Sequence, residues 1–405
     1  MDQVSSLDAV VFDEAYFADP YAKYAELHAT GCPVFRTETP EGVPAWLITG
    51  HEEVRAALKD LRLSRRLDNA GADYRRLPFP SEFTAKSVVT EDPPEHTRLR
   101  HVLNQAFSPR SISRLRPRVE AVAAALVDAI KAKGSADLVT DLAIPLPLTI
   151  IAEMLGIDAR HQADFHRWGD GMLSLDTETR RESSARMLQF LVDQLKGKAA
   201  EPGDDMLTYW LNSRDEEGNP LDPQEVVGLA MVMLVGGYDT SVGMIGATLY
   251  GLLREPERYH ALLAEPQLLP EVIEEYLRLY GTVHTGVRRF AAQDLEIGSQ
   301  KIPAGDVVLL SLGAADRDPE RYPDPDTADF GRQSRSSHLA FGLGPHVCPG
   351  NELARIEISA AVQAAMTGLP GLRLAVPEEQ VSWRRAYFIR VPLTLPVVFD
   401  VPVGG

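Results

Sequence analysis

The chain has 405 residues, 44% of them hydrophobic and 24% charged, with a formal net charge of -17 at neutral pH. This composition is typical of an ordinary globular protein, and the acidic charge argues against general binding to nucleic acid or to anionic membranes. Two cysteines cannot build a disulfide framework, which favours a reducing compartment and predicts a cytoplasmic protein.

The chain contains neither an internal repeat nor a low-complexity linker. We therefore expect one domain over residues 1–405, although the length alone would suggest two or three. Residues 1–20 mix acidic and apolar side chains without a continuous apolar run. They predict neither a signal peptide nor a membrane anchor.

Short elements are predicted at the start of the chain: a helix over residues 20–30, strands at 34–35 and 45–49, and a helix over 51–59. Residues 64–87 contain Pro, Gly and several Arg and predict no regular element. A connection of this length is either functional or mobile.

Two prolines, Pro93 and Pro94, mark the start of a helix that places His96 and Arg100 on one face. On charge alone, this face is either solvated or a site for an anion. Six arginines and one acid fall between residues 95 and 118, and this basic patch could steer an acidic partner. The arginines are Arg98, Arg100, Arg110, Arg114, Arg116 and Arg118.

Residues 119–200 predict mostly helix, with breaks at Gly134 and at Pro145 and Pro147, and with a helix pair over 158–201. The acidic stretch 201–225 carries turn signals, and we expect a surface connection there.

A helix of about 30 residues is predicted over 223–254, and it is apolar almost all round, which indicates burial in the centre of the protein. It does not predict a membrane span, because Gly, Asp and Thr interrupt it. Gly236 and Gly237 each cost about 1 kcal/mol relative to Ala in a helix interior, so we expect a compensating role such as room for a ligand. Asp239 and Thr240 need polar partners there, and Thr240 alone could bond back to the preceding turn.

Glu275 and Arg278 lie one helical turn apart and share a helix face. By spacing alone they are a weak signal, since most such pairs are exposed and contribute less than about 1 kcal/mol. Strands are predicted around residues 294–297 and 307–310, and a helix from 355 to about 367.

Residues 341–355 read FGLGPHVCPGNELAR. A lone cysteine is usually a small buried hydrophobe, but glycines here let the backbone approach a flat ligand closely. Pro349 suits the first position of a helix, which would put Cys348 just before a helix N-terminus. The partial positive charge there favours the thiolate, the form that serves a haem iron as an axial ligand.

This run resembles the haem-binding signature of the cytochromes P450, Phe-Gly-x-Gly-x-His-x-Cys-x-Gly followed by Leu-Ala-Arg, and matches every fixed position. The patterns around His96, Thr240 and Glu275 resemble further motifs of that family, in its order. The resemblance covers nearly the whole chain. It implies a mainly α fold with small β-sheets (α+β), with haem between the long central helix and the loop and helix at Cys348.

The resemblance also implies roles for individual residues. Cys348 would bind the iron of haem b, Asp239 would relay protons from solvent, and Thr240 would act in oxygen activation. The other cofactor-binding residues would be His96, Arg100, Arg289, Phe341, Gly342 and His346. A buried structural group would consist of Glu275, Arg278 and Arg332. The substrate pocket would include Val232, Val235, Gly236, His284, Thr285 and Phe388.

Two of these assignments depend on further reasoning. The number of residues before Asp294 matches Arg289, rather than Arg288, to the propionate-binding arginine of the family that the chain resembles. For His284 and Thr285 the alternative is a loop that satisfies its own backbone. The segments 64–92, 161–200, 282–288 and 385–390 are expected to contact the substrate.

The implied activity is that of a monooxygenase that inserts one oxygen atom from O2 into a hydrophobic small molecule. The expected reaction hydroxylates or epoxidises a secondary metabolite such as a macrolide or another polyketide. Electrons would come from ferredoxin and ferredoxin reductase, because the sequence shows no flavin or iron–sulfur segment. The alternatives are an acyl or aminoacyl substrate on a carrier protein, a peroxygenase, and a non-catalytic haem sensor. The Asp239-Thr240 pair argues against the last two.

Overall fold

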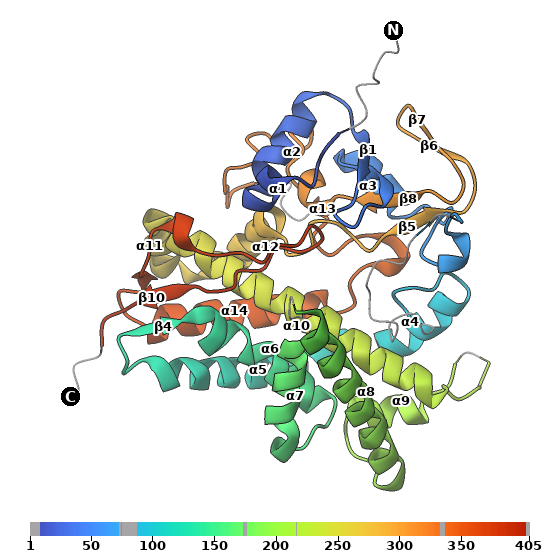
Figure 1. The fold of residues 1–405 in the computed structure, drawn as a ribbon. Coiled ribbons are helices and arrows are strands. Elements are labelled where there is room, and N and C mark those ends of the chain that lie inside the picture. The colour runs from blue at the N-terminus through green and yellow to red at the C-terminus, as the bar shows by residue number, and fades with distance from the viewer. Residues whose placement is uncertain are drawn as a thin grey trace.

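The computed structural model describes residues 9–72, 74, 87–172, 176–215, 217–332 and 337–401. Within them the chain is mainly helical with small β-sheets (Figure 1), which confirms the predicted fold class. Of the segment predicted to be irregular, residue 73 and residues 75–86 lie outside this description.

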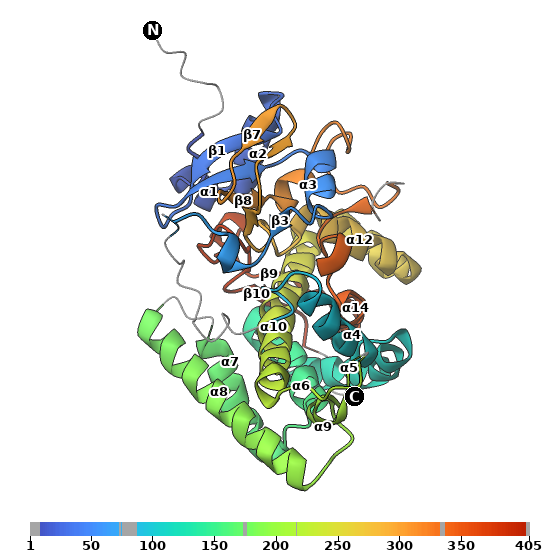
Figure 2. The same ribbon diagram turned by 90° about the vertical axis from the view of Figure 1, so that its right-hand side faces the viewer.

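Most helices gather on one side of the molecule, and the strands near the N-terminus lie on the other side together with α1, α2 and α3 (Figures 1 and 2). Several helices begin with a proline in the first turn, where its missing N–H needs no partner. The α-helices are α1 (Glu14–Ala18), α2 (Pro20–Ala29), α3 (His51–Ala57), α4 (Glu95–Ala106), α5 (Pro109–Ile130), α6 (Pro145–Met154), α7 (Ala159–Gly171), α8 (Thr177–Ala200), α9 (Met206–Asn212), α10 (Pro223–Leu253), α11 (Pro256–Ala264), α12 (Leu269–Tyr280), α13 (Leu312–Ala315) and α14 (Asn351–Gly368).

The largest sheet joins strands from distant parts of the sequence in the order β1-β2-β8-β5-β3. β2 and β8 pair in parallel with Leu47 opposite Leu309, and β3 pairs with β5 with Leu63 opposite Ala291. Two smaller sheets have the orders β4-β10-β9 and β6-β7. The strands are β1 (Val34–Glu38), β2 (Pro44–Ile48), β3 (Leu63–Ser64), β4 (Ser135–Asp137), β5 (Arg289–Ala291), β6 (Leu295–Ile297), β7 (Gln300–Ile302), β8 (Val307–Leu310), β9 (Arg373–Leu374) and β10 (Pro396–Val398).

α10 crosses the middle of the molecule in both views (Figures 1 and 2) and packs against α6, α12 and α14. A capping box fixes its start: the Asp222 side chain accepts N–H groups of the first turn, and Glu225 accepts the backbone N–H of Asp222 at 3.0 Å. Among the described residues it is the one helix with the length and hydropathy to cross a membrane. However, 67% of that apolar window is buried inside the protein, as in a core helix.

One predicted connection contains a helix. Residues 201–225 were expected to form a surface connection, but α9 lies within them and its Trp210 is completely buried. The apolar pair Leu207 and Trp210, one turn apart, anchors α9 to the core, and Asp205 caps it by accepting the N–H of Thr208 at 2.9 Å.

The largest buried hydrophobic cluster draws on residues from Val88 to Phe399 and so spans most of the chain. A smaller cluster between the main sheet and α2 is continuous with it through Tyr21, which packs against both. On this basis we propose that the chain forms a single domain.

Glu275 and Arg278 on α12 meet Arg332 in one buried group. Arg278 donates from Nε and Nη2 to the two carboxylate oxygens of Glu275 at 3.0 and 2.7 Å, and Arg332 Nε donates to Oε1 at 3.1 Å. Arg278 Nη1 also donates to the carbonyl oxygens of Asp316 and Pro325 at 2.9 and 2.7 Å. The side chains of Glu275 and Arg278 have no exposed surface, so the alternative of an exposed pair does not apply.

We expect Arg278→Ala to destabilise the fold by about 3–5 kcal/mol, because it leaves the carboxylate of Glu275 buried without its main partner. Denaturant unfolding and haem content after purification measure the effect. Glu178 and Arg181 have the same spacing in an exposed pair, so Arg181→Ala is the matched control and should change little. A folded, fully haem-loaded Arg278→Ala protein would contradict this assignment.

Candidate active site

The loop before α14 holds Cys348 through its own backbone. Gly342 and Gly344 have φ angles of 67° and 77°, which favour glycine. A Cβ at Gly344 would also lie 2.9 Å from the carbonyl oxygen of Leu58. The backbone N–H of Cys348 donates to the carbonyl oxygen of Phe341 at 2.9 Å, which closes the turn.

The structure modifies two expectations about Cys348. α14 begins at Asn351, so Pro349 lies outside the helix. Burial raises the pKa of the Cys348 thiol, although a backbone N–H and two guanidinium groups lower it. The local positive charge therefore acts in the predicted direction but does not outweigh burial. A bound metal cation would supply the missing stabilisation, because coordination deprotonates a thiol.

Five side chains that carry or can carry positive charge gather near this loop: Arg65, His96, Arg100, Arg289 and His346. The rings of His96 and His346 lie 4.0 Å apart. Burial, Arg100 and Arg65 lower the pKa of His96 to about 4. Burial and the neighbouring Arg65 lower the pKa of His346 to about 2. Both imidazoles are therefore neutral in the protein without an added anion.

Arg65 was missed in the sequence. Desolvation and the neighbouring Arg289 lower its pKa to about 9. It follows β3, which pairs with the strand that begins at Arg289, so the sheet brings the two guanidinium groups together. The available signal was the pair Arg65-Arg66 at the start of the irregular segment, but the strand pairing that gives it meaning is not local in sequence.

The residues present fit haem b. Nε2 of His96 and Nε of Arg65 and Arg289 are enclosed polar atoms with no hydrogen-bond partner among the described residues. Two propionates would supply acceptors for them and the negative charge that like-charged neighbours need. Cβ atoms added at Gly236 or Gly342 would meet nothing within 4 Å, so there is open space beside both α10 and the Cys348 loop.

α10 presents a partly exposed face in the middle of its otherwise buried length. Val232, Val235, Gly236 and Thr240 lie on this face, as the helical period predicts. Thr240 Oγ1 donates to the carbonyl oxygen of Gly236 at 2.5 Å, so the hydroxyl bonds back to its own helix. The face is apolar apart from this hydroxyl and can contact a hydrophobic substrate.

The residues on either side of Thr240 have partners on other elements. Both oxygens of Asp239 accept hydrogen bonds from Nη1 of Arg384, at 2.7 and 2.6 Å. Ser241 Oγ donates to Glu357 on α14 at 2.7 Å, and both residues are buried. Burial raises the pKa of Glu357 to about 8, so its carboxyl group is mostly protonated at neutral pH. Neither partner was predicted, although the position of Glu357 between two isoleucines of α14 was a usable signal.

Two residues of the predicted pocket wall have partners inside the protein. His284 is 2% exposed, and its Nδ1 lies 2.9 Å from the hydroxyl oxygen of Tyr24. Thr285 is 3% exposed and donates to the carbonyl oxygen of Tyr387 at 3.3 Å. Internal partners already satisfy both side chains, in agreement with the alternative of a loop that satisfies itself, and their assignment to the pocket stays a prediction. Phe388 is 41% exposed at the tip of the turn and stays a pocket candidate.

Several arginines of the predicted basic patch have partners within the protein. Arg98 pairs with Glu95 and Glu225, Arg118 with Glu153, and Arg116 lies 4.0 Å from Glu120. Arg100 donates to the carbonyl oxygen of Val347 at 2.6 Å. Arg110 and Arg114 are exposed on the first turns of α5 and have no ion pair among the described residues.

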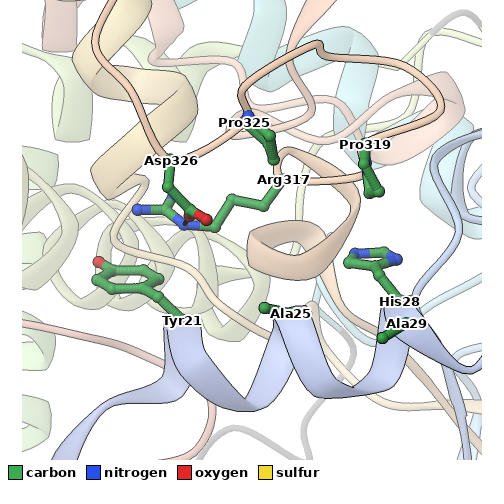
Figure 3. Close-up of a pocket in the computed structure, with 8 residues that line it drawn as sticks. All are labelled: Tyr21, Ala25, His28, Ala29, Arg317, Pro319, Pro325 and Asp326. Carbon is green, nitrogen blue, oxygen red and sulfur yellow. Dashed lines mark ion pairs between the residues drawn. The ribbon is translucent and has the colours of Figure 1, made fainter.

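A small cavity of about 230 Å³ lies between α2 and the loop after α13 (Figure 3). Arg317 and Asp326 form an ion pair at one end, with 3.0 Å between Nε and Oδ1. None of the lining residues is a predicted site residue, so we do not assign the substrate to it. They are Tyr21, Ala25, His28, Ala29, Arg317, Pro319, Pro325 and Asp326.

Comparison with known proteins agrees with this geometry. The family model described as Cytochrome P450 matches residues 12–164 and 170–367. The chain is 37% identical to 6-deoxyerythronolide B hydroxylase of Saccharopolyspora erythraea over 401 residues, which covers 96% of this chain and 98% of the relative. It is 38% identical to the cytochrome P450 monooxygenase PikC of Streptomyces venezuelae over 398 residues, covering 96% and 94%.

Solved structures give the same result. Cytochrome P450 PksS of the Bacillus subtilis bacillaene polyketide synthase superposes with a TM-score of 0.90 at 28% identity, covering 97% of this chain and all of that one. P450BioI, solved with an acyl carrier protein that bears a fatty acid, superposes with a TM-score of 0.85 at 26% identity, covering 96% and 100%.

We expect Arg65→Met to release haem about tenfold faster than the unchanged protein, because it removes a charged partner of the propionates. Transfer of haem to apomyoglobin measures the rate. The neighbouring Arg66 is exposed and pairs with Asp68, so Arg66→Met is the control and should leave the rate unchanged. Equal rates for the two variants would remove Arg65 from the site.

Glu357→Gln should change how stability depends on pH. The pKa of Glu357 is raised from its ordinary 4.5 to about 8 in the folded protein, so unfolding releases a proton between these values. The stability that the protonated carboxyl contributes is lost as the pH rises through this window. A glutamine cannot titrate, so the variant should gain stability relative to the unchanged protein between pH 5 and pH 8.

Urea unfolding midpoints at pH 5 and pH 8 test this, with the exposed Glu352→Gln on the same helix as the control. Parallel pH dependence in Glu357→Gln and the unchanged protein would show that the carboxyl is ionised in the fold.

Proposed function

Because this chain belongs to the cytochrome P450 family and is a haem-thiolate monooxygenase, we propose that it hydroxylates or epoxidises a hydrophobic macrolide- or polyketide-like secondary metabolite. The observation that carries the proposal is the partly exposed apolar face of Val232, Val235 and Gly236 beside Thr240. The names of the relatives support it, since they include hydroxylases and epoxidases such as mycinamicin IV hydroxylase/epoxidase.

When bound, haem b supplies the two-electron activation of dioxygen and the transfer of one oxygen atom to the substrate. Cys348 would hold it as the thiolate, and the arginine and histidine side chains near the Cys348 loop would hold its propionates. The apolar face of α10 positions a hydrophobic substrate and excludes water.

Protons reach the site through groups on and beside α10. Thr240 Oγ1 carries a proton at the edge of the open space and is oriented by the carbonyl oxygen of Gly236. Asp239 lies one residue away and exchanges protons at its carboxylate, which Arg384 keeps in place. Ser241 and the protonated Glu357 hold further protons on the side toward α14.

The electrons come from a separate redox partner, for which we propose a ferredoxin and its reductase. Arg110 and Arg114 on α5 are exposed and can contact an acidic protein. We propose the cytoplasm as the compartment, since both the acidic composition and the sparse cysteines fit it.

The carrier-protein alternative is kept for a specific reason. P450BioI, which is similar over 96% of this chain, was solved in complex with an acyl carrier protein ligated to hexadec-9Z-enoic acid. The sensor alternative is not kept, because the named relatives are hydroxylases and oxygenases.

Turnover with ferredoxin, reductase and NADPH tests the proposal, with macrolactones offered both free and as thioesters of an acyl carrier protein. We expect free macrolactone to shift the Soret band and to gain one oxygen atom from ¹⁸O2. Product from the thioester alone would establish the carrier-bound substrate instead. Cys348→Ser is the negative control and should lose both the thiolate-type carbonyl spectrum and the product. No product from either form would refute the proposed substrate class.

A further inference from the structure

Glu274 serves a different part of the structure from its buried neighbour Glu275. Its carboxylate accepts hydrogen bonds from Arg355 at both oxygens, with Nε to Oε1 at 2.6 Å and Nη2 to Oε2 at 3.0 Å. Nε2 of His338 lies 3.2 Å from Oε2. The side chain of Glu274 is 19% exposed and that of His338 is 3% exposed, so these contacts are partly removed from water.

Arg355 connects Glu274 to the carbonyl group of Cys348. Its Nη1 donates to the side-chain oxygen of Asn351 at 2.9 Å and to the backbone oxygen of the same residue at 3.2 Å. Asn351 Nδ2 then donates to the carbonyl oxygen of Cys348 at 2.8 Å. A continuous series of hydrogen bonds therefore runs from α12 to the backbone of the cysteine.

A second connection reaches the N–H group of Cys348 through Phe341. The guanidinium carbon of Arg355 lies 4.6 Å from the centre of the Phe341 ring, and the ring of His338 lies 6.0 Å from it. Both neighbours of the ring are thus held by Glu274. The carbonyl oxygen of Phe341 accepts the N–H of Cys348 at 2.9 Å, so the position of Phe341 sets this bond.

The charge of Glu274 supports the same connection to the Cys348 loop. Burial would raise the pKa of Glu274, but hydrogen bonds from His338 and Arg355 bring it down to about 2, so the carboxylate is ionised at neutral pH. The guanidinium group of Arg355 is held at both carboxylate oxygens of Glu274 and contacts Asn351 and the ring of Phe341 in the Cys348 loop. Glu274 therefore fixes the place of a positive charge beside this loop.

We propose that Glu274 is a positioning residue for Cys348, acting through Arg355 and Asn351 on its carbonyl group and through Phe341 on its N–H group. The proposal rests on the proposed function only in that Cys348 is the haem ligand. Its consequence is that Glu274 sets how firmly the thiolate is retained and at which potential the iron is reduced.

Three variants of the haem-loaded protein test this. Glu274→Gln keeps the size of the side chain but removes the charge and one acceptor. Asn351→Leu keeps all charges and removes only the hydrogen bonds to Cys348 and Arg355. Glu257→Gln removes an equal charge from an exposed position on α11, and is the matched control.

The readouts are the reduction potential, the rate at which the thiolate-type carbonyl complex converts to the thiol-type complex, and haem transfer to apomyoglobin. We expect Glu274→Gln to raise the potential, because the charge of Arg355 is no longer neutralised. Both Glu274→Gln and Asn351→Leu should lose the thiolate form and haem about 10–100-fold faster, as when the partner of a metal ligand is removed. Glu257→Gln should match the unchanged protein.

Equal behaviour of Glu274→Gln and Glu257→Gln would overturn the proposal, as would a lower melting temperature in Glu274→Gln with unchanged spectra and potential. If Glu274→Gln fails to fold, Asn351→Leu decides the question by the same rates. Absence of a thiolate-type carbonyl complex in the unchanged protein would instead refute the ligand assignment on which the proposed function depends.

Discussion

Three arginines and two histidines gather in one place beside the Cys348 loop, and the chain alone leaves several of their buried polar atoms without a partner among the described residues. Arg65 and Arg289 are delivered by the main sheet, His96 and Arg100 by α4, and His346 by the loop of Cys348. Burial lowers the pKa of Arg65, His96 and Arg289, and positively charged neighbours lower it further for Arg65 and His96. A dianionic cofactor removes this penalty, so haem b is part of the folding energy as well as of the chemistry.

The parts of this arrangement that were predictable are those written in contiguous residues. The Cys348 loop, the Gly-rich middle of α10 and the helix around Glu275 each carry a local pattern, and the structure places them as one unit. Arg65, Arg384 and Glu357 were missed because each acquires its partner from a segment far away in sequence, across a sheet or between two helices. His284 was assigned wrongly for the same reason, since its partner Tyr24 lies 260 residues earlier.

α10 shows how helix geometry separates tasks among consecutive residues. Successive side chains point about 100° apart. Asp239 therefore reaches Arg384, Thr240 faces the open space, and Ser241 reaches Glu357 on α14. The same rule divides Glu274 from Glu275 on α12, where one carboxylate holds the cysteine loop and the other holds residues 329–332. Neighbouring residues of identical type thus belong to independent networks.

The order of strands in the main sheet has a consequence for how the protein is made. β2 pairs in parallel with β8, and β3 pairs antiparallel with β5. The sheet therefore cannot close around the residues before 65 until residues near 290–310 are present. Contacts so distant in sequence form late and slowly. Arg65 and Arg289 sit at this closure, and Cys348 emerges from the ribosome later still. Haem capture is therefore a late event in biosynthesis, and a nascent chain interrupted before residue 348 has no means of retaining the cofactor through its iron.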